Sequence, residues 1–174
     1  MVQPPHTCAM CVSEGGPTTS SWHDKPISVR PFRASDQAAA RRLVEEGLGE
    51  HFGYVDREAN PDLVDIAASY TKPPNAFFVA EMNRILVGTT GLIVQADTGR
   101  LVRVAVAREY RRLGIATLMM NYVADFARRA RLAKLVAHTQ PEWPDAMGFY
   151  RSHGFIPYGR DPIDVYLHRS VADA

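Results

Sequence analysis

The chain has 174 residues, of which 46% are hydrophobic, and its formal net charge is +1. A chain of this length and composition can bury one good core, so we expect one folded domain. The balanced charge argues against nucleic acid as a partner, because a general nucleic-acid-binding protein carries a large basic excess. No apolar run approaches the ~18 residues that a membrane span needs, so we expect no membrane segment.

The N-terminal segment differs from the rest in composition. Residues 1–25 contain prolines, glycines and a Ser/Thr cluster at 18–21, and no Lys or Arg precedes Lys25. A secretory signal or an arginine-rich transit peptide would need basic residues there, so neither is predicted. We therefore predict a flexible tail over residues 1–25, a folded domain over 26–170 and a cytoplasmic location.

Both cysteines lie in this segment. Cys8 and Cys11 form a C-x-x-C pair, with His6 and His23 nearby. These four side chains could supply the ligands of a zinc site, and the pair could also be redox-active. A single C-x-x-C outside the folded pattern favours reduced thiols with neither role. We expect no metal.

The first part of the folded region predicts one strand and two helices. A β-branched run predicts a strand at 27–32. Residues 35–36 are typical caps of a helix, which the glycines at 47–49 are expected to end. A proline in its first turn marks a second helix at 61–70. The aromatic segment 51–54 is expected in a loop, which either plugs the core or forms one wall of a substrate pocket.

The remainder predicts a hairpin followed by alternating strands and helices. In chain order we expect strands at 76–82, 85–95 and 101–107, a helix to about 131, a strand at 134–139, a helix at 144–150 and strands at 155–158 and 163–167. The helical connection makes 101–107 and 134–139 parallel. The order predicts a single-domain α/β fold, with a mixed central sheet of about seven strands flanked by about four helices.

The stretch 101–131 carries the strongest pattern in the chain. Residues 101–107 are apolar apart from Arg103, as expected of a strand covered on both faces. Apolar side chains recur at helical spacing over 115–126. A basic, glycine-containing turn at 108–114 joins the two. The first turn of a helix leaves backbone N–H groups without partners, and the helix dipole adds positive charge.

Small residues and arginines make this turn suitable for an anion. Gly114 and Ala116 let an anion approach the backbone closely, while Arg111 and Arg112 add positive charge. The pattern predicts a site for a diphosphate rather than for a lone anion. It is not a P-loop, because the chain contains no Gly-Lys pair, and it lacks the three glycines of a dinucleotide fingerprint.

The segment R-x-x-G-x-A at 111–116 resembles the acetyl-CoA-binding motif [RQ]-x-x-G-x-[GA] of the GNAT N-acetyltransferase superfamily. A second segment, AMGFYRSHGF at 146–155, resembles the A-x-x-[FL]-Y-x-x-x-G-F segment of the same family. One predicted helix and one predicted strand separate the two motifs, as in the family. The order of elements over residues 27 to 169 also agrees, so the chain is identified as a member of this superfamily.

This resemblance implies acetyl transfer from acetyl-CoA to a primary amine, by direct attack in a ternary complex. The backbone of Val104, Ala105 and Val106 would pair with the pantetheine amides, and an N–H near Val106 would stabilise the developing oxyanion. The residues implied to hold the diphosphate are Arg111, Arg112, Leu113, Gly114, Ile115, Ala116 and Thr117.

Two catalytic residues follow from the same resemblance. Tyr150 occupies the position of the family's tyrosine acid, which protonates the departing thiolate; the alternative is that Tyr150 is stacked in the core or only contacts CoA. A phenol with an ordinary pKa of about 10 stays protonated at neutral pH, as that role requires. His138 stands where many members carry a glutamate base, and imidazole could serve directly or through a water. The alternatives are that His138 only lines the pocket and that Glu81, another carboxylate or bulk water is the base.

The sequence also departs from the family pattern. Trp143 replaces an asparagine that often bonds the pantetheine arm, which puts one cofactor contact in doubt, and Arg108 replaces a common proline.

The acceptor is less constrained by the sequence. The family's acceptor pocket is made by the first helices and the last hairpin, where this chain has Phe52, Tyr54, Tyr158, Asp161 and Asp164. These residues favour a small-molecule amine. A protein or peptide acceptor, or a non-catalytic acyl-CoA sensor, remains as an alternative, and the sequence leaves a homodimer open.

Overall fold

The computed structural model describes residues 18–22, 25–56 and 58–172. The strands are β1 (Thr18–Trp22), β2 (Lys25–Pro31), β3 (Ala76–Met82), β4 (Ile85–Gln95), β5 (Thr98–Val106), β6 (Lys134–Thr139), β7 (Ile156–Arg160) and β8 (Val165–Ser170). The α-helices are α1 (Gln37–Phe52), α2 (Ile66–Tyr70), α3 (Ile115–Arg129) and α4 (Pro144–Ser152). Short 3₁₀ turns lie at Ala34–Asp36, Pro61–Leu63 and Arg108–Tyr110.

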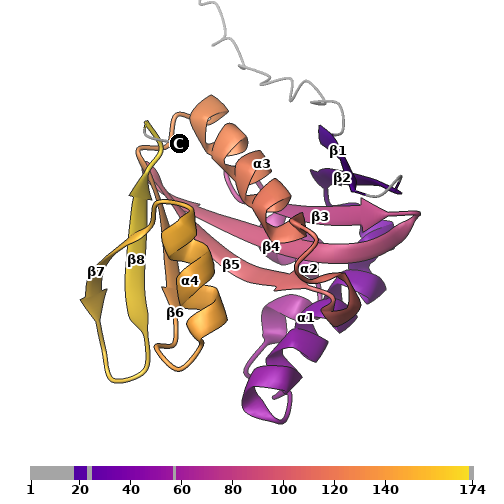
Figure 1. Cartoon of the computed structure of the whole chain (residues 1–174), viewed down its shortest axis with the longest axis horizontal. Coiled ribbons are helices and arrows are strands. Elements are labelled where there is room, and N and C mark those ends of the chain that lie inside the picture. The colour runs from indigo at the N-terminus through magenta and orange to yellow at the C-terminus, as the bar shows by residue number, and fades with distance from the viewer. Residues whose placement is uncertain (1–17, 23–24, 57, 173–174) are drawn as a thin grey trace, which may run out of the picture.

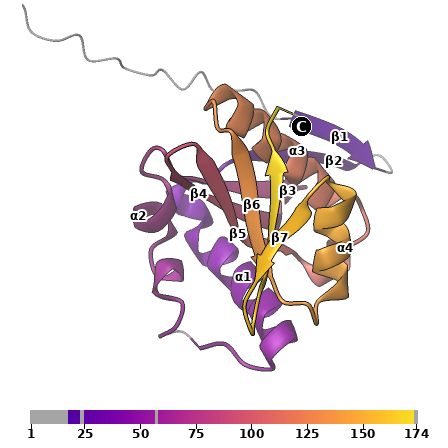
Figure 2. The same cartoon turned by 90° about the vertical axis from the view of Figure 1, so that its left-hand side faces the viewer.

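The described strands form one mixed sheet in the order β1-β2-β3-β4-β5-β6-β8-β7. Every neighbouring pair is antiparallel except β5 and β6, which the α3 crossover makes parallel. Figures 1 and 2 show α3 and α4 on one face of the sheet and α1 and α2 on the other. The predicted α/β fold, with a mixed sheet and four helices, is confirmed.

The sheet has one strand more than the sequence predicts. β1 pairs antiparallel with β2, with Thr18 opposite Val29 and Trp22 opposite Lys25. It lies within segment 1–25, for which a flexible tail is predicted, so residues 18–22 differ from that expectation. Short-range pattern misses such a strand because β1 has polar residues and gains its hydrogen bonds from β2. Cys8, Cys11, His6 and His23 lie outside the described residues.

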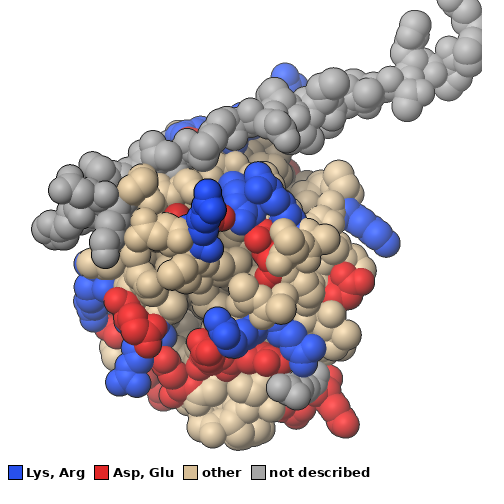
Figure 3. All heavy atoms as spheres, turned by 90° about the vertical axis from the view of Figure 1, so that its right-hand side faces the viewer, with Lys and Arg blue, Asp and Glu red and all other residues tan. Residues whose placement is uncertain are grey.

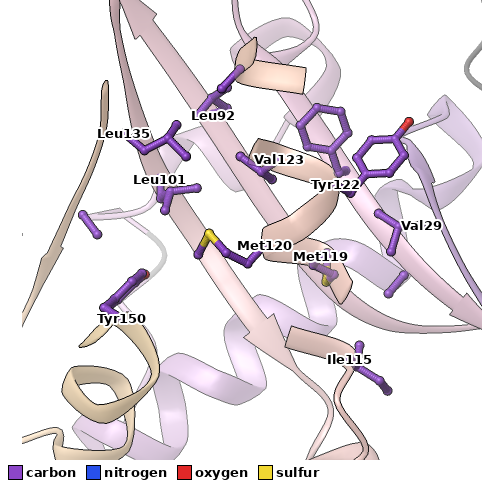
Figure 4. Close-up of a cluster of buried hydrophobic side chains, with 14 of the residues drawn as sticks. Val29, Leu92, Leu101, Ile115, Met119, Met120, Tyr122, Val123, Leu135 and Tyr150 are labelled. Atoms are coloured by element: carbon purple, nitrogen blue, oxygen red, sulfur yellow. The ribbon is translucent and has the colours of Figure 1, made fainter. Parts of the chain in front are cut away.

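The helices divide the core into two clusters, one on each face. Between the sheet and the α3/α4 layer lies the larger cluster, part of which Figure 4 shows, including Leu92, Leu101, Met119, Val123 and Leu135. The other cluster, under α1 and α2, contains Phe32, Val44, Leu63, Ile66, Phe77 and Val79. Both faces of the central strands are therefore buried, which explains their nearly continuous apolar sequence.

Two helices differ from their predicted bounds. The glycines at 47–49 do not end α1, which continues to Phe52 and stops at Gly53, where φ is +74°. A Cβ on Gly47 would lie 3.7 Å from that of Ala105, so packing on β5 supports the helix there. His51 and Phe52 are consequently helical, although the sequence predicts them in a loop. The predicted helix at 61–70 is interrupted, because Asp65 caps α2 by accepting a hydrogen bond from the Ala68 N–H.

None of the described helices is both long and apolar enough to cross a bilayer. On the face shown in Figure 3, lysines and arginines are interspersed with aspartates and glutamates. This pattern agrees with the small net charge of +1. It provides no continuous basic surface on that face for a phosphate backbone.

Gly88 of β4 determines how closely α3 lies on the sheet. A Cβ there would be 2.7 Å from Met119 Sδ and 3.1 Å from Ala80 Cβ. We predict that Gly88→Ala lowers the free energy of unfolding by about 1–3 kcal/mol through overpacking.

The matched control for this substitution is Gly148→Ala. Gly148 is exposed within α4, and a Cβ there would meet nothing within 4 Å. It should raise stability by about 0.5–1 kcal/mol, the ordinary gain of alanine over glycine in a helix. Urea unfolding measures both variants, and equal effects of the two would contradict this account of α3 packing.

Candidate active site

The central feature of the site is the divergence of two parallel strands. β5 pairs with β6 only from Thr98 to Leu101, opposite 134–137. Beyond Leu101, β5 remains paired with β4 as far as Val106, while β6 remains paired with β8 as far as Thr139. The β6-facing edge of residues 102–106, which include Val104, Ala105 and Val106, is thus without a strand partner. An extended ligand with amide groups can bond to such an edge.

A β-bulge accompanies this divergence. Two register steps on β4, from Thr89 to Gly91, correspond to three on β5, from Ala105 to Val102. Arg103 lies in this bulge, on the strand that has the extra residue. It has a left-handed φ of +53°, an unfavourable conformation for a residue with a long side chain. The buried Thr89 hydroxyl donates to the Arg103 carbonyl at 2.9 Å. A bulge bends its strand and increases the local twist, which turns β5 away from β6.

The Arg103 side chain is anchored on the opposite layer. Its Nη2 lies 2.6 Å from Asp62 Oδ1, and its Nη1 donates to Asn60 Oδ1 at 2.8 Å. Burial opposes ionisation of Asp62, but hydrogen bonds from Arg103 and Tyr70 outweigh it and hold the Asp62 pKa below its ordinary value. Burial and the bond to Asp62 raise the pKa of Tyr70 to about 12. The network ties the bulge to the segment before α2.

A curled loop follows the free edge. Arg112 and Gly114 have φ values of +64° and +76°, and the first bond of α3 runs from the Leu118 N–H to the Gly114 carbonyl. The N–H groups of residues 115–117 therefore have no partner within the helix. Left-handed positions of this kind make backbone N–H groups converge on an anion. The Ile115 side chain is buried in the core, so only its backbone can face a ligand.

Both arginines of the loop are paired with carboxylates. Arg111 Nη2 lies 2.6 Å from Glu50 Oε2 at the end of α1, and its Nε donates to the Val106 carbonyl at 3.0 Å. Arg112 Nη2 lies 3.1 Å from Asp145 Oδ1 in the first turn of α4. The charges predicted to hold a diphosphate thus face acidic groups in this structure. These pairs are at least one-third exposed, so each contributes little stability and an anion can displace it.

Tyr150 projects from α4 into the core beside the sheet (Figure 4). Its ring contacts Phe149 and Phe155, with centroids 5.4 and 5.3 Å away. The side chain is buried, and this burial raises the pKa of its hydroxyl well above the ordinary value of 10. The phenol is therefore a neutral proton donor throughout the physiological pH range.

His138 lies on the other face of β6. Strand alternation places it opposite to Leu135 and Ala137, which belong to the core on the α3/α4 side. His138 is exposed on β6, and its partial desolvation together with nearby Arg100 lowers its pKa below 6.5, against opposing effects of Asp164 and Asp161. A neutral imidazole can accept a proton at neutral pH. Tyr150 and His138 thus approach the diverging strands from opposite faces.

An aromatic residue of the last hairpin, Tyr166, contacts His138. Its ring centroid is 4.5 Å from that of Tyr166, and Tyr158 lies 6.1 Å from Tyr166. Asp161 accepts hydrogen bonds from the Ile163 and Asp164 N–H groups and from the Tyr166 hydroxyl. Its carboxylate is therefore engaged in the hairpin turn.

Trp143 connects the two sides of the site. Its ring stacks on His51 at 4.1 Å and meets the edge of Phe52 at 5.4 Å. This packing joins the end of α1 to the start of α4 across the divergence. It gives a structural role to the tryptophan that replaces the family's asparagine. A cleft of about 500 Å³ lies beside this junction, lined by Glu46, Gly47, Glu50, Val106, Arg108 and Arg111 among others.

Sequence reasoning missed two features of the site. The first is the network of Asp62 and Arg103, which are 41 positions apart in the chain. The only sign of this network in the sequence is Arg103, a single charged residue in an otherwise apolar strand. The second is Thr139, the last residue of β6, which is only 4% exposed. Its hydroxyl has no hydrogen-bond partner within the described part of the chain.

Comparison with known proteins gives a family and several relatives. The model of the acetyltransferase (GNAT) family matches residues 34–155. The chain is 36% identical over 110 residues to the probable N-acetyltransferase camello of Xenopus tropicalis, an overlap of 61% of this chain and 50% of that protein. The chain spans about half the length of the curated relatives that head the comparison.

Solved structures share the fold at low sequence identity. An acetyltransferase of the GNAT family from Staphylococcus aureus superposes with a TM-score of 0.77 at 22% identity, covering 83% of this chain and 99% of that one. The PaiA N-acetyltransferase from Thermoplasma acidophilum, in complex with coenzyme A, gives 0.73 at 14% identity, covering 83% and 98%. Identity this low supports the fold alone, whereas the family match extends over both sequence motifs and the diverging strands. The chain belongs to the acetyltransferase (GNAT) family.

Proposed function

We propose that the protein is an N-acetyltransferase, which moves the acetyl group of acetyl-CoA to a primary amine by direct attack in a ternary complex. The divergence of β5 and β6 is the observation that carries the proposal, because it leaves a free strand edge between an anion-binding loop and a buried tyrosine. Family membership supports the same reading.

The residues present fit acetyl-CoA at three positions. The free edge of Val104, Ala105 and Val106 pairs with the pantetheine amides. Backbone N–H groups of the segment 111–117 hold the diphosphate, and Arg111 and Arg112 supply charge once they leave Glu50 and Asp145. Bound acetyl-CoA supplies an activated acyl group with a thiolate as leaving group. An N–H near Val106 polarises the carbonyl, an interaction whose loss costs about 3 kcal/mol of transition-state stabilisation in other enzymes.

Tyr150 and His138 divide the proton transfers. Tyr150 donates its phenolic proton to the departing sulfur on the α4 side. His138 accepts a proton from the amine on the opposite face, directly or through a water. Burial favours the neutral form of Tyr150, and partial desolvation beside Arg100 favours the neutral form of the exposed His138. These are the forms that the two roles need.

The acceptor enters from the face that carries His138, Tyr158 and Tyr166. Aromatic rings at this position can contact a cationic or an aromatic amine. A cleft of about 500 Å³ between α1 and the end of β5, with Glu46 and Glu50 in its wall, has the size of a small-molecule site. These features favour a small amine over a protein or peptide acceptor.

The acid role predicts a selective defect in Tyr150→Phe. Turnover, followed by thiol release over a panel of small amines and peptides, should fall at least about tenfold, since general acids contribute about 10²–10⁴-fold. CoA affinity should be retained. Tyr122→Phe is the control, because Tyr122 is another buried tyrosine but packs under α3 against Phe78. CoA binding by the wild type without turnover on any acceptor would favour a sensor instead.

The base role predicts a pH profile. kcat/KM should decline about tenfold per pH unit below an apparent pKa lower than 6.5, because only neutral His138 accepts the proton and its pKa is lowered. His138→Gln should abolish this acid limb. His153→Gln, at the end of α4, should leave it in place. An unchanged limb in His138→Gln would exclude His138 as the base.

The carboxylate of Glu50 competes with a diphosphate for Arg111. Glu50→Gln should therefore tighten CoA binding about two- to fivefold, the range of an exposed ion pair. Glu46→Gln is the matched control, since Glu46 lies one turn earlier in α1 and pairs with Arg42 instead. Calorimetric titration with CoA compares the variants. Weaker binding by Glu50→Gln would show that Glu50 positions Arg111 rather than competing for it.

A further inference from the structure

His138 lies where the two parallel strands separate, and its side chain is exposed. It follows Ala137, the last residue of β6 that pairs with β5. Within the described part of the chain, no group hydrogen-bonds its ring nitrogens. Among the described aromatic side chains, Tyr166 is the one whose ring packs on it, with the two centroids 4.5 Å apart. An exposed imidazole held in this way depends on Tyr166 for its orientation.

The ring of Tyr166 is fixed from several sides. Tyr166 stands opposite His138 in the register of β6 and β8, so the two side chains share a face of the sheet. A Cβ on Gly159 of β7 would lie 3.3 Å from Tyr166 Cδ2, so the ring lies directly over that glycine. At its far end the Tyr166 hydroxyl donates a hydrogen bond to the Asp161 carboxylate. Movement of the ring away from His138 would break this bond.

Asp161 is itself fixed by the turn between β7 and β8. Its Oδ1 accepts hydrogen bonds from the Ile163 N–H at 2.7 Å and the Asp164 N–H at 2.6 Å, which leaves Oδ2 for the Tyr166 hydroxyl. The bond to Tyr166 lowers the pKa of Asp161 and raises the pKa of Tyr166. At neutral pH the carboxylate is therefore ionised and the phenol keeps its proton. The turn thus holds the phenol by its hydroxyl, and the phenol ring holds His138.

We propose that Asp161 and Tyr166 are positioning residues for His138, an assignment that rests on the proposed function. Tyr166 keeps the imidazole in one orientation, and Asp161 keeps Tyr166 in place. The proton passes from the amine nitrogen to a ring nitrogen of His138, and neither residue touches the reacting atoms. A base that is already oriented loses little side-chain freedom when the amine attacks, whereas a misplaced one lowers the rate.

The kinetic test is a double-mutant cycle with a small amine and saturating acetyl-CoA. Tyr166→Phe keeps the ring but removes the bond to Asp161, so kcat should fall about three- to tenfold while KM for the amine changes by less than about twofold. Asp161→Ala removes the same bond and should lower kcat as much, with no further loss in the double variant. In a His138→Gln background, Tyr166→Phe should not lower kcat further. Tyr122→Phe, in the core against Phe78, is the control that should keep kcat.

A second measurement does not need turnover. In NMR spectra of the free wild type, the ring protons of His138 should show Overhauser contacts with the ring protons of Tyr166. These contacts should weaken in Tyr166→Phe, although a ring is retained there, and should persist in Tyr122→Phe. The melting temperature of each variant shows whether it is folded.

Other outcomes overturn the inference. An equal loss of kcat from Tyr166→Phe in the wild-type and His138→Gln backgrounds would show that Tyr166 does not act through His138. A raised KM with an unchanged kcat would make Tyr166 a contact of the acceptor instead. Full Overhauser contacts in Tyr166→Phe would show that the bond to Asp161 does not hold the ring. A wild type without turnover on any amine would contradict the proposed function, and the Overhauser contacts would then still decide whether Asp161 and Tyr166 fix the imidazole.

Discussion

The site depends on one structural constraint, the bulge at Arg103 that turns β5 away from β6. A regular parallel pair would satisfy the backbone of both strands and leave no gap for a ligand. The bulge places Arg103 at a φ of +53°, and Thr89, Asn60 and Asp62 hold it there. Such strain persists only where the surroundings fix it, and it occurs most often at functional sites. The residues around Pro61 therefore help to shape the free edge of β5, which they do not line.

The free protein carries several hydrogen-bonding groups that have no partner among the described residues. They include the outer edge of β5 and the N–H groups at the start of α3. Meanwhile Glu50 and Asp145 pair with the loop arginines from the two sides of the gap. Together they support the proposal that the gap holds an elongated molecule with amides in its middle and phosphates at one end.

Local pattern was sufficient for most of the fold. The strands at 76–82, 85–95 and 134–139 have the predicted bounds, because strand periodicity and adjacent turns coincide there. Both family motifs also lie where the sequence places them, on the loop before α3 and on α4. What could not be predicted depends on contacts between distant segments. The bulge depends on contacts with Asp62, and the end of α1 depends on contacts with β5 and Trp143. The Thr139 hydroxyl has no hydrogen-bond partner among the described residues, and the sequence alone does not show whether a threonine has one.

The most direct test of the account is amide hydrogen exchange of the full chain with and without CoA. If the arm pairs with the free strand edge, CoA should slow exchange of backbone amides within 104–106 and 113–117, while amides in β3 keep their rates. Slower exchange confined to the loop at 113–117 would mean that CoA binds by its phosphates alone. CoA binding without protection of either segment would contradict the central claim that the gap between β5 and β6 is the cofactor site.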